Sequence, residues 1–285
     1  MIVAPSVESA KFAQAIDTIA IGALMAELAC YPKPGLVSFY DRGSHADMDA
    51  ATFIASINAL RGYFAEMAYA GGNTVDFGTL NQIGWAAERK MLIVTNGVNT
   101  HRGAVFSLGL LAAGAGYVVS RGLRPFAELV CRQVGALWGT DILATRHQCR
   151  GSNGAHARRQ YGVAGAREHA ASGFPTLRHH SLPAMRHALN ADIDRNWSGV
   201  HAFLASLAVL DDTNLLHRGG SEALAYAQHR AREVILRGGA LTADGRNAAR
   251  MLHREFVAAW LSPGGSADML ALCYFLADIE ITFRN

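Results

Sequence analysis

The uncharged run G-A-V-F-S-L-G-L-L-A-A-G-A-G-Y-V-V-S, residues 103 to 120, decides how the chain is expected to fold. A segment of this length and composition is long enough to cross a bilayer. However, the segment is rich in Gly and Ala, it follows a polar loop, and no second such segment comes after it. Helices that are apolar on all sides are also found enclosed by other helices. We therefore expect a buried central helix over residues 104–119 in preference to a membrane span.

The polar loop T-N-G-V-N-T-H-R-G, residues 95–103, leads into this helix. A side-chain oxygen of Asn99 or Thr100 is placed to cap the first turn, and Gly97 permits a tight turn or a close backbone approach. Unpaired N–H groups, the helix dipole and Arg102 would together attract a phosphate. Taken alone, the loop fits a plain capped connection between helices equally well, but segments of similar composition recur along the chain.

Apolar residues recur at helical spacing through most of the remaining chain. The further helix candidates are residues 7–30, 50–69, 80–94, 125–138, 181–190, 196–210, 217–236, 243–260 and 267–281. Strand signals are nearly absent, because the chain has no alternating β-branched run and no βαβ spacing. Residues 139–178 are the least regular part, and no repeat or linker divides the chain. The sequence therefore predicts an all-α fold in a single compact domain over residues 1–285, with long functional loops.

The composition limits the class of protein. Hydrophobic residues make up 51% of the 285 residues and charged residues 17%, which indicates a large buried core. A net charge of +3 is too small for a nucleic-acid surface but is compatible with small anionic ligands. The four scattered cysteines form no C-x-x-C pair, and the N-terminus lacks the apolar core of a signal peptide. We expect a cytoplasmic protein without a nucleic-acid or membrane partner.

Polar clusters interrupt the apolar background, and each joins glycines to a carboxylate or a cation. They are residues 31–49, 95–103, 161–174, 211–220 and 261–268. Most of them abut the start of a predicted helix. If these helix ends converge on one cleft, they supply N–H groups and cations for phosphates, and carboxylates for a divalent metal. The standard nucleotide signatures G-x-x-x-x-G-K-[ST] and strand-borne G-x-G-x-x-G are missing, so any nucleotide must bind in another way.

Some charged residues have two interpretations. Glu27 lies near the C-terminus of the first predicted helix, where the dipole disfavours a negative charge, so it is either solvent-exposed or kept for a function. Glu88 fits a solvated helix face equally well. His45 and Asp47 form a lone H-x-D, which suits a hydrogen-bonded loop as well as a metal site.

Six motifs in a fixed order resemble a known family. They are P-K-P-G-L-V at 32–37, H-A-D-M-D at 45–49, G-V-N-T-H-R-G-A-V-F-S-L-G at 97–109, G-A-R at 165–167, D-T-N-L-L-H-R-G-G at 212–220 and S-P-G-G-S-A-D at 262–268. Over about residues 15–280 the chain resembles the triphosphoribosyl-dephospho-CoA synthases.

The resemblance implies a reaction and its partners. Such enzymes join ATP and 3′-dephospho-CoA, release adenine, and make the prosthetic-group precursor of an acyl carrier protein in citrate lyase or malonate decarboxylase. The form V-S-F-Y-D-R-G-S-H at 37–45 is more similar to the malonate decarboxylase branch. The implied metal is Mg²⁺, and the implied functional link is to the carrier protein and its prosthetic-group transferase. A homodimer is possible, although no stretch of the chain marks an interface.

The resemblance also implies roles for residues. Glu27 or Glu88 would take the proton of the attacking hydroxyl, and Asp212, with Asp47 or Asp268, would gather Mg²⁺. The phosphate-binding cations would be Lys33, Arg102, Arg167 and Arg218. The other substrate-binding residues would be Pro34, Gly35, His45, Asn99, Thr100, His101, Gly103, Asn214, Gly219, Gly220, Ser262, Gly264, Gly265 and Ser266.

The chain departs from the family pattern in its middle. His169 stands where a Glu is expected, with Glu168 one place earlier. Asn153 occupies a turn in which a His is expected, and His156 is close enough in sequence to substitute. These departures put in doubt only the roles assigned to this stretch.

Two other functions are weighed against the synthase. An all-α metal-dependent phosphohydrolase is suggested by His45, Asp47 and the many carboxylates, but the adjacent His-Asp pair of such hydrolases does not occur. A non-catalytic CoA- or nucleotide-binding partner of a carrier-protein complex needs fewer polar clusters than this chain has.

Overall fold

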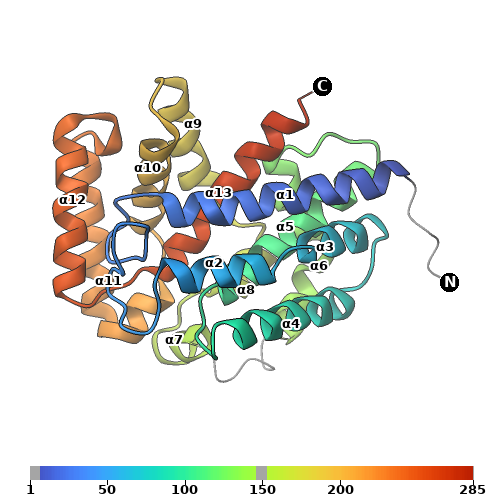
Figure 1. The fold of residues 1–285 in the computed structure, drawn as a ribbon, viewed down its shortest axis with the longest axis horizontal. Coiled ribbons are helices and arrows are strands. Elements are labelled where there is room, and N and C mark those ends of the chain that lie inside the picture. The colour runs from blue at the N-terminus through green and yellow to red at the C-terminus, as the bar shows by residue number, and fades with distance from the viewer. Residues whose placement is uncertain (1–6, 146–152, 285) are drawn as a thin grey trace.

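The computed structural model describes residues 7–145 and 153–284, and within these ranges it contains helices and no strand (Figure 1). The helices are α1 (Val7–Ala29), α2 (Ala50–Ala59), α3 (Tyr63–Gly72), α4 (Phe77–Val94), α5 (Arg102–Ser120), α6 (Ala127–Ala144), α7 (Asn153–Tyr161), α8 (Ala166–Ala171), α9 (Leu182–Asn190), α10 (Arg195–Leu207), α11 (Thr213–Leu236), α12 (Ala243–Ala258) and α13 (Gly264–Thr282). A π-helical turn (Leu177–Ser181) precedes α9, and a 3-10 turn (Gly239–Leu241) precedes α12. The predicted all-α class is confirmed.

The predicted central helix is α5, which is buried around most of its circumference. It lies directly against α3, because glycines stand at the contact. A Cβ at Gly116 would be 1.9 Å from the carbonyl oxygen of Ala68, and one at Gly71 would be 2.0 Å from that of Ala113. Only glycine allows two backbones to approach this closely. The small residues of α5 therefore explain how one helix is enclosed by its neighbours α3, α6 and α13.

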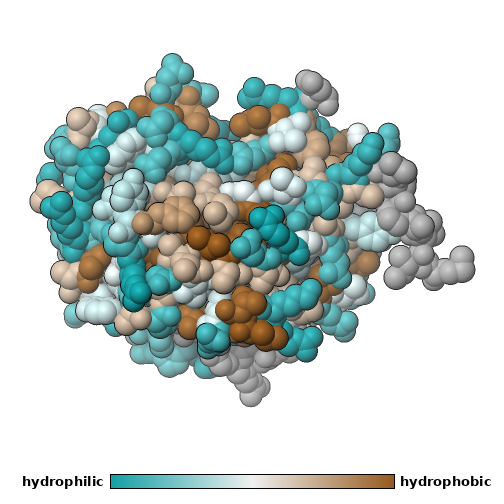
Figure 2. All heavy atoms as spheres, in the orientation of Figure 1, coloured by the Kyte–Doolittle hydropathy of each residue, from teal (hydrophilic) through white to brown (hydrophobic). Residues whose placement is uncertain are grey.

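Among the described residues, α1 and α5 are long and apolar enough to cross a membrane by length and composition alone. In α5, however, 72% of the apolar stretch that could span a membrane is buried inside the fold, as expected of a core helix. On the face drawn in Figure 2, apolar side chains lie in separate patches among hydrophilic ones. The interior of the fold thus accounts for the apolar composition of α5.

The single helix expected over residues 50–69 is wrong, because the chain forms α2 and α3 with a break between them. Gly62 has a left-handed φ of 84°, which ends the helical path. The buried Asp17 carboxylate accepts the N–H groups of Gly62, at 2.9 Å, and of Phe64, at 3.2 Å. A carboxylate from α1 thus caps the start of α3.

The long loop between α1 and α2 is tied to the C-terminal third of the chain (Figure 1). Ser44 Oγ donates to the carbonyl of Leu261 at 2.7 Å. Arg218 Nη1 donates to the carbonyls of both Ser44 and Trp260 at 2.8 Å. His253 on α12 bonds the loop through Nε2, which lies 3.0 Å from an Asp41 carboxylate oxygen. The loop therefore forms a fixed wall beside α11 and α13.

Candidate active site

The first turns of five helices line one cavity, here called the first cavity. The contributors from α5, α7, α8, α11 and α13 are Gly103, Gly154, Ala166, Thr213 and Gly265. Helix N-termini carry unpaired N–H groups and a partial positive charge, which together attract anions. The condition considered from the sequence, that helix starts meet at one cleft, is therefore met at this cavity.

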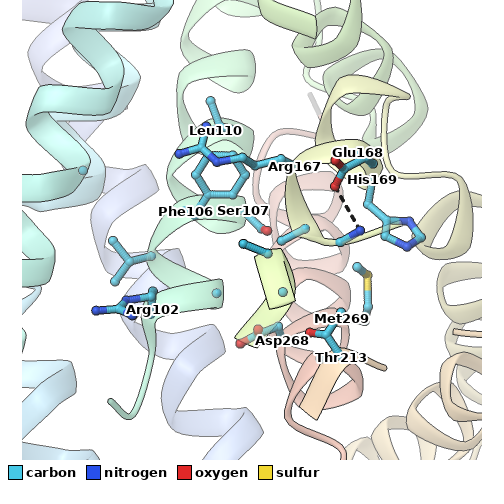
Figure 3. Close-up of a pocket in the computed structure, with 18 of the residues that line it drawn as sticks. Arg102, Phe106, Ser107, Leu110, Arg167, Glu168, His169, Thr213, Asp268 and Met269 are labelled. Atoms are coloured by element: carbon cyan, nitrogen blue, oxygen red, sulfur yellow. Dashed lines mark hydrogen bonds between the residues drawn. The ribbon is translucent and has the colours of Figure 1, made fainter. Parts of the chain in front are cut away.

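The first cavity has a volume of about 290 Å³ and a largely aromatic and aliphatic lining. Its apolar lining residues include Phe77, Leu80, Trp85, Phe106 and Met269. The Arg167 guanidinium lies 4.9 Å from the centre of the Phe106 ring. Figure 3 shows these two side chains next to each other. Apolar walls with a few placed polar groups are typical of pockets that hold a flat organic ring or an acyl chain.

A second cavity of about 490 Å³ adjoins the first and is more polar. The loop between α1 and α2 forms one side of it through Leu36, Val37, His45, Asp47 and Met48. Most of the remaining lining comes from the loop before α5, from the starts of α5 and α11, and from α13 with the loop before it. Its charged lining residues include Glu27, Asp47 and Arg218.

The two cavities share part of their lining. The shared residues are Asn99, Arg102, Gly103, Asn214 and Asp268. All of these were predicted as site residues from the sequence. A molecule in either cavity would therefore contact the same group of side chains.

Close contacts at three glycines shape the shared wall and the residues next to it. A Cβ at Gly103 would stand 1.9 Å from Asp268 Oδ2, and one at Gly264 would stand 2.5 Å from Asn214 Nδ2. At Gly265 a Cβ would lie 3.1 Å from Asp212 Oδ2. Glycine is thus needed at the starts of α5 and α13 so that polar side chains can lie against the backbone.

Asp268 and Asp212 lie near each other in an environment that disfavours negative charge. Burial raises the pKa of the Asp268 carboxyl well above its usual range, and the charges of Asp212 and Glu27 add to this effect. The surface that Asp268 still exposes faces the two cavities. Burial also raises the pKa of Asp212, although its hydrogen bonds oppose the shift.

Asp212 has a clear structural role. One carboxylate oxygen accepts the Asn214 N–H at 3.0 Å and so caps α11. The other accepts the Ser266 N–H at 2.8 Å and the Ser266 hydroxyl at 3.0 Å. These bonds hold the N-termini of α11 and α13 together. Ser266 therefore contacts Asp212 and lines neither cavity.

Glu27 is buried, and its partner is the ammonium group of Lys33. Lys33 Nζ donates to a Glu27 carboxylate oxygen and, at 2.5 Å, to the Glu27 carbonyl. Glu27 lines the second cavity, whereas Lys33 is 1% exposed and lines neither cavity. Lys33, predicted as a phosphate ligand, thus lies behind Glu27 and compensates its charge at the C-terminal end of α1.

Glu88 and Arg102 form an ion pair at the first cavity. Arg102 Nε and Nη2 both lie 2.5 Å from Glu88 Oε1. Arg102 also reaches the second cavity, and its backbone N–H is capped by Asn99 Oδ1 at 3.1 Å. Asn99 therefore performs the predicted capping, although α5 itself begins one residue after His101.

His45 is held between Arg218 and Ser262 at the second cavity. Arg218 Nη2 lies 3.3 Å from His45 Nδ1, and His45 Nε2 lies 2.8 Å from Ser262 Oγ. Burial and the charge of Arg218 lower the pKa of His45. A neutral ring that accepts from Arg218 at Nδ1 donates to Ser262 from Nε2, which leaves the Ser262 hydroxyl hydrogen for another acceptor.

His101 lines the second cavity and is 3% exposed. Its Nδ1 lies 2.7 Å from Ser56 Oγ, which in turn accepts a hydrogen bond from Thr100 Oγ1 at 2.8 Å. Burial and the positive charge of Lys33 lower the pKa of His101 to about 3. The ring is therefore neutral near pH 7. Ser56 was not predicted from the sequence, because it lies inside an apolar helical pattern and carries no motif.

The other site residues predicted from the sequence fall into three groups according to which cavity they line. Glu88, Arg167, Asp212 and Gly265 line the first cavity only. Glu27, His45, Asp47, Thr100, His101, Arg218, Ser262 and Gly264 line the second cavity only. Lys33, Pro34, Gly35, Gly219, Gly220 and Ser266 line neither.

Structural reasons explain the glycines that line neither cavity. Gly35 has a φ of 70°, and a Cβ there would lie 2.0 Å from the Leu261 carbonyl oxygen, so it fixes the turn next to Pro34. Gly219 and Gly220 interrupt the helical path of α11 and produce a kink. The kink follows Arg218, which bonds the neighbouring loops.

The departures from the family pattern lie partly at the first cavity. His169 and Glu168 both line it, as Figure 3 shows. Glu168 accepts from Arg158 and from the Gly165 N–H, both at 3.0 Å, whereas His169 Nδ1 is buried without a partner in the described residues. His156 is exposed and does not line either cavity. The side chain of Asn153 lies outside the described residues.

A metal site made only of protein groups is not present in the described part of the chain, where no three His, Cys, Asp or Glu side chains cluster suitably. Mg²⁺, however, is commonly held by one or two carboxylates together with substrate phosphates. The raised pKa values of Asp212 and Asp268 indicate a place where a cation would relieve unfavourable charge. Both residues fit a metal that arrives with its ligand.

Comparison with known proteins identifies the family. A family model described as ATP:dephospho-CoA triphosphoribosyl transferase matches residues 13–284. The chain belongs to this family. The ATP:dephospho-CoA triphosphoribosyl transferases are transferases, so the expected enzyme class is confirmed. No match was found among solved structures.

Individual relatives agree with this family. The chain is 35% identical to a probable 2-(5″-triphosphoribosyl)-3′-dephosphocoenzyme-A synthase of Acinetobacter calcoaceticus, over 96% of this chain and 94% of the relative. It is 37% identical to the synthase of Klebsiella pneumoniae, over 90% of this chain and 87% of the relative. A probable synthase of Azotobacter vinelandii is also 37% identical, over 95% and 93% of the two chains.

Proposed function

We propose that this protein transfers the 5-triphosphoribosyl group of ATP to the 2′-hydroxyl of 3′-dephospho-CoA and releases adenine. Membership of the transferase family and the names of the relatives support this reaction. The observation that carries the proposal is the shared wall of Asn99, Arg102, Gly103, Asn214 and Asp268, which two adjoining cavities contact. A reaction between two large substrates needs two binding volumes that meet at the reacting atoms.

The chemistry requires one bond to break and one to form. The C1′–N9 bond of ATP breaks, and adenine leaves with its electron pair. The 2′-hydroxyl oxygen of 3′-dephospho-CoA bonds to C1′, and its proton passes to a carboxylate. The departing adenine takes up one proton on nitrogen, so that in the net reaction the hydroxyl proton ends on adenine and the carboxylate is regenerated. Glu88 at the first cavity and Glu27 at the second are the candidate bases, each next to a cation. A well-placed base contributes about 10²- to 10⁴-fold to such a step.

The cations and helix starts are proposed to hold the phosphates. Arg102 reaches both cavities, Arg167 lines the first and Arg218 lines the second. Asp268 and Asp212 are proposed to bind Mg²⁺ together with the triphosphate; Asp47, which is exposed at the second cavity, is the further candidate. When bound, Mg²⁺ would neutralise phosphate charge.

We also propose the pathway that uses the product. The loop form V-S-F-Y-D-R-G-S-H at 37–45 supports the malonate decarboxylase branch, with a carrier protein and its prosthetic-group transferase downstream. A cytoplasmic location and a homodimer belong to the same proposal. The branch is tested by measuring whether the product serves as the prosthetic-group precursor for the carrier protein of malonate decarboxylase or for that of citrate lyase.

The reaction is tested by mass spectrometry of the purified protein incubated with ATP, Mg²⁺ and 3′-dephospho-CoA. We expect free adenine and a dephospho-CoA adduct that carries triphosphoribose. Phosphate or ADP without adenine would indicate a phosphohydrolase instead. No turnover, with ATP or 3′-dephospho-CoA still raising the melting temperature, would indicate a non-catalytic binding partner.

A further inference from the structure

His101 has a buried ring nitrogen that the described part of the chain leaves without a hydrogen-bond partner. Its Nδ1 is bonded to Ser56, and the unpartnered atom is Nε2. Buried polar atoms are rarely left unpaired, because the lost hydrogen bond to water costs free energy. Since His101 lines the second cavity, a molecule bound there is the natural source of the missing partner.

The hydrogen bonds around Ser56 favour one position for the ring proton. Thr100 Oγ1 donates to Ser56 Oγ at 2.8 Å, so the Ser56 hydroxyl hydrogen is available for His101 Nδ1, 2.7 Å away. A neutral imidazole that accepts at Nδ1 carries its hydrogen on Nε2. In this arrangement the unpaired group of His101 is an N–H donor.

The charges near His101 favour a neutral donor that faces an anion. His101 directly precedes α5, whose N-terminus carries the positive end of the helix dipole. The adjacent Arg102 reaches the same cavity, and Lys33 lies close enough to disfavour a second ring proton. A neutral imidazole beside a helix N-terminus is a known form of hydrogen-bond donor to a developing or fixed negative charge.

We propose that His101 Nε2–H donates a hydrogen bond to a phosphoryl oxygen of a substrate in the second cavity. Ser56 and Thr100 are positioning residues that hold the ring in this tautomer. The inference rests on the proposed function only for the choice of substrates. Because ATP and 3′-dephospho-CoA both carry phosphoryl groups, each is tested separately.

The tautomer is tested by ¹H–¹⁵N correlation spectra of the histidine side chains in the full-length protein. The His101 signal is assigned by its loss in His101→Gln. We expect protonated Nε2 and unprotonated Nδ1 in the wild type, and a mixture of tautomers in Ser56→Ala. Ser206→Ala is the matched control, because Ser206 is equally buried but bonds only to carbonyls of its own helix. A His101 ring protonated at Nδ1 alone would overturn the inference.

The ligand is tested by calorimetric titration with ATP, 3′-dephospho-CoA and inorganic tripolyphosphate. The Gln amide nitrogen can reach the position of Nε2, whereas the shorter Asn side chain cannot. We therefore expect His101→Gln to stay within about threefold of wild type and His101→Asn to weaken binding by about 10- to 100-fold. A loss confined to ATP and tripolyphosphate assigns the triphosphate, and a loss confined to 3′-dephospho-CoA assigns its diphosphate.

Failure of this inference is distinguishable from failure of the proposed function. Equal affinities of the Gln and Asn variants for all three probes would overturn the role of His101, even if the wild type releases adenine. If the wild type releases no adenine but the Asn variant alone loses affinity, the His101 contact stands and the transfer reaction fails.

Discussion

The Asp268 carboxylate occupies the space that a side chain on Gly103 would fill, since a Cβ there would lie 1.9 Å from Oδ2. Gly103 has ordinary helical backbone angles in the first turn of α5, so the constraint is space and not conformation. This contact places a carboxylate of α13 directly over the N-terminus of α5, where both cavities meet.

Gly103→Ala is expected to displace Asp268 from the shared wall. Turnover should fall by at least about 10²-fold, because a shift of about 1 Å in a positioned group costs this much. Adenine release at saturating ATP measures the effect. The control is Gly22→Ala in α1, where a Cβ meets nothing within 4 Å. That variant should keep full activity and gain about 0.5–1 kcal/mol of unfolding free energy. Full activity of Gly103→Ala would show that Asp268 is not needed in its observed place.

The buried pair of Glu27 and Lys33 predicts strongly non-additive stability. Lys33→Met leaves the Glu27 carboxylate buried without its partner, so the unfolding free energy should fall by about 3–5 kcal/mol. The double variant Lys33→Met with Glu27→Gln should recover much of this loss. Urea unfolding at pH 7 measures Lys33→Met, Glu27→Gln, the double variant and the wild type. Additive losses would mean that the two charges do not interact in solution.

Glu27→Gln and Glu88→Gln separate the two candidate bases. The residue that takes the hydroxyl proton should lose about 10²- to 10⁴-fold in kcat when its carboxylate becomes an amide, because the amide cannot accept the proton. Both proteins are first checked for native circular dichroism, since Glu27→Gln also leaves the buried Lys33 ammonium group without an opposite charge. Wild-type turnover in both variants would show that neither Glu27 nor Glu88 takes the hydroxyl proton.

Arg102→Ala is expected to raise the KM for ATP by about 10-fold or more, because a charge-assisted contact to phosphate is lost. Steady-state kinetics with ATP varied at saturating 3′-dephospho-CoA measures the change. Arg89→Ala, on the same helix as Glu88 and exposed, is the control for removal of a positive charge. An unchanged KM in Arg102→Ala would rule out a phosphate contact by Arg102.

The low pKa of His101, about 3, predicts a pH-dependent stability. In the unfolded chain a histidine titrates near pH 6.5, so below this pH the unfolded state binds a proton that folded His101 does not. The contribution of His101 should therefore destabilise the fold by about 1.4 kcal/mol per pH unit between about pH 6 and pH 4. His101→Gln lacks this pH-dependent contribution to the free energy of unfolding, because glutamine does not titrate. Unfolding free energies of both proteins across this range should converge as the pH falls, and parallel curves would contradict a buried neutral ring.

Local patterning was enough to predict most of the helices. The expected helix at residues 7–30 is α1, and those at 181–190 and 243–260 are α9 and α12 within a few residues. The break between α2 and α3 was missed, because it depends on a carboxylate of Asp17, far away in sequence. The short helices α7 and α8 were expected to be irregular, since they are too short for a hydrophobic period.

Site residues in motifs were predictable, but their partners were not. The loop at 95–103 and the starts of α11 and α13 meet as expected at Asp268 and Asn214. Lys33 was assigned to phosphate, yet its ammonium group bonds Glu27, because only the tertiary fold buries both. The apolar lining of the first cavity carries no signal that separates it from the core. A hydrogen-bond partner such as Ser56 is set by how helices pack, which sequence spacing does not encode.

The wall that the two cavities share has a thermodynamic consequence. Arg102 and Asp268 contact both volumes, so a molecule that fixes either side chain in one cavity changes the free energy of binding in the other. Equilibrium linkage makes such an effect reciprocal. Whatever factor ATP imposes on the affinity for 3′-dephospho-CoA, 3′-dephospho-CoA imposes equally on the affinity for ATP.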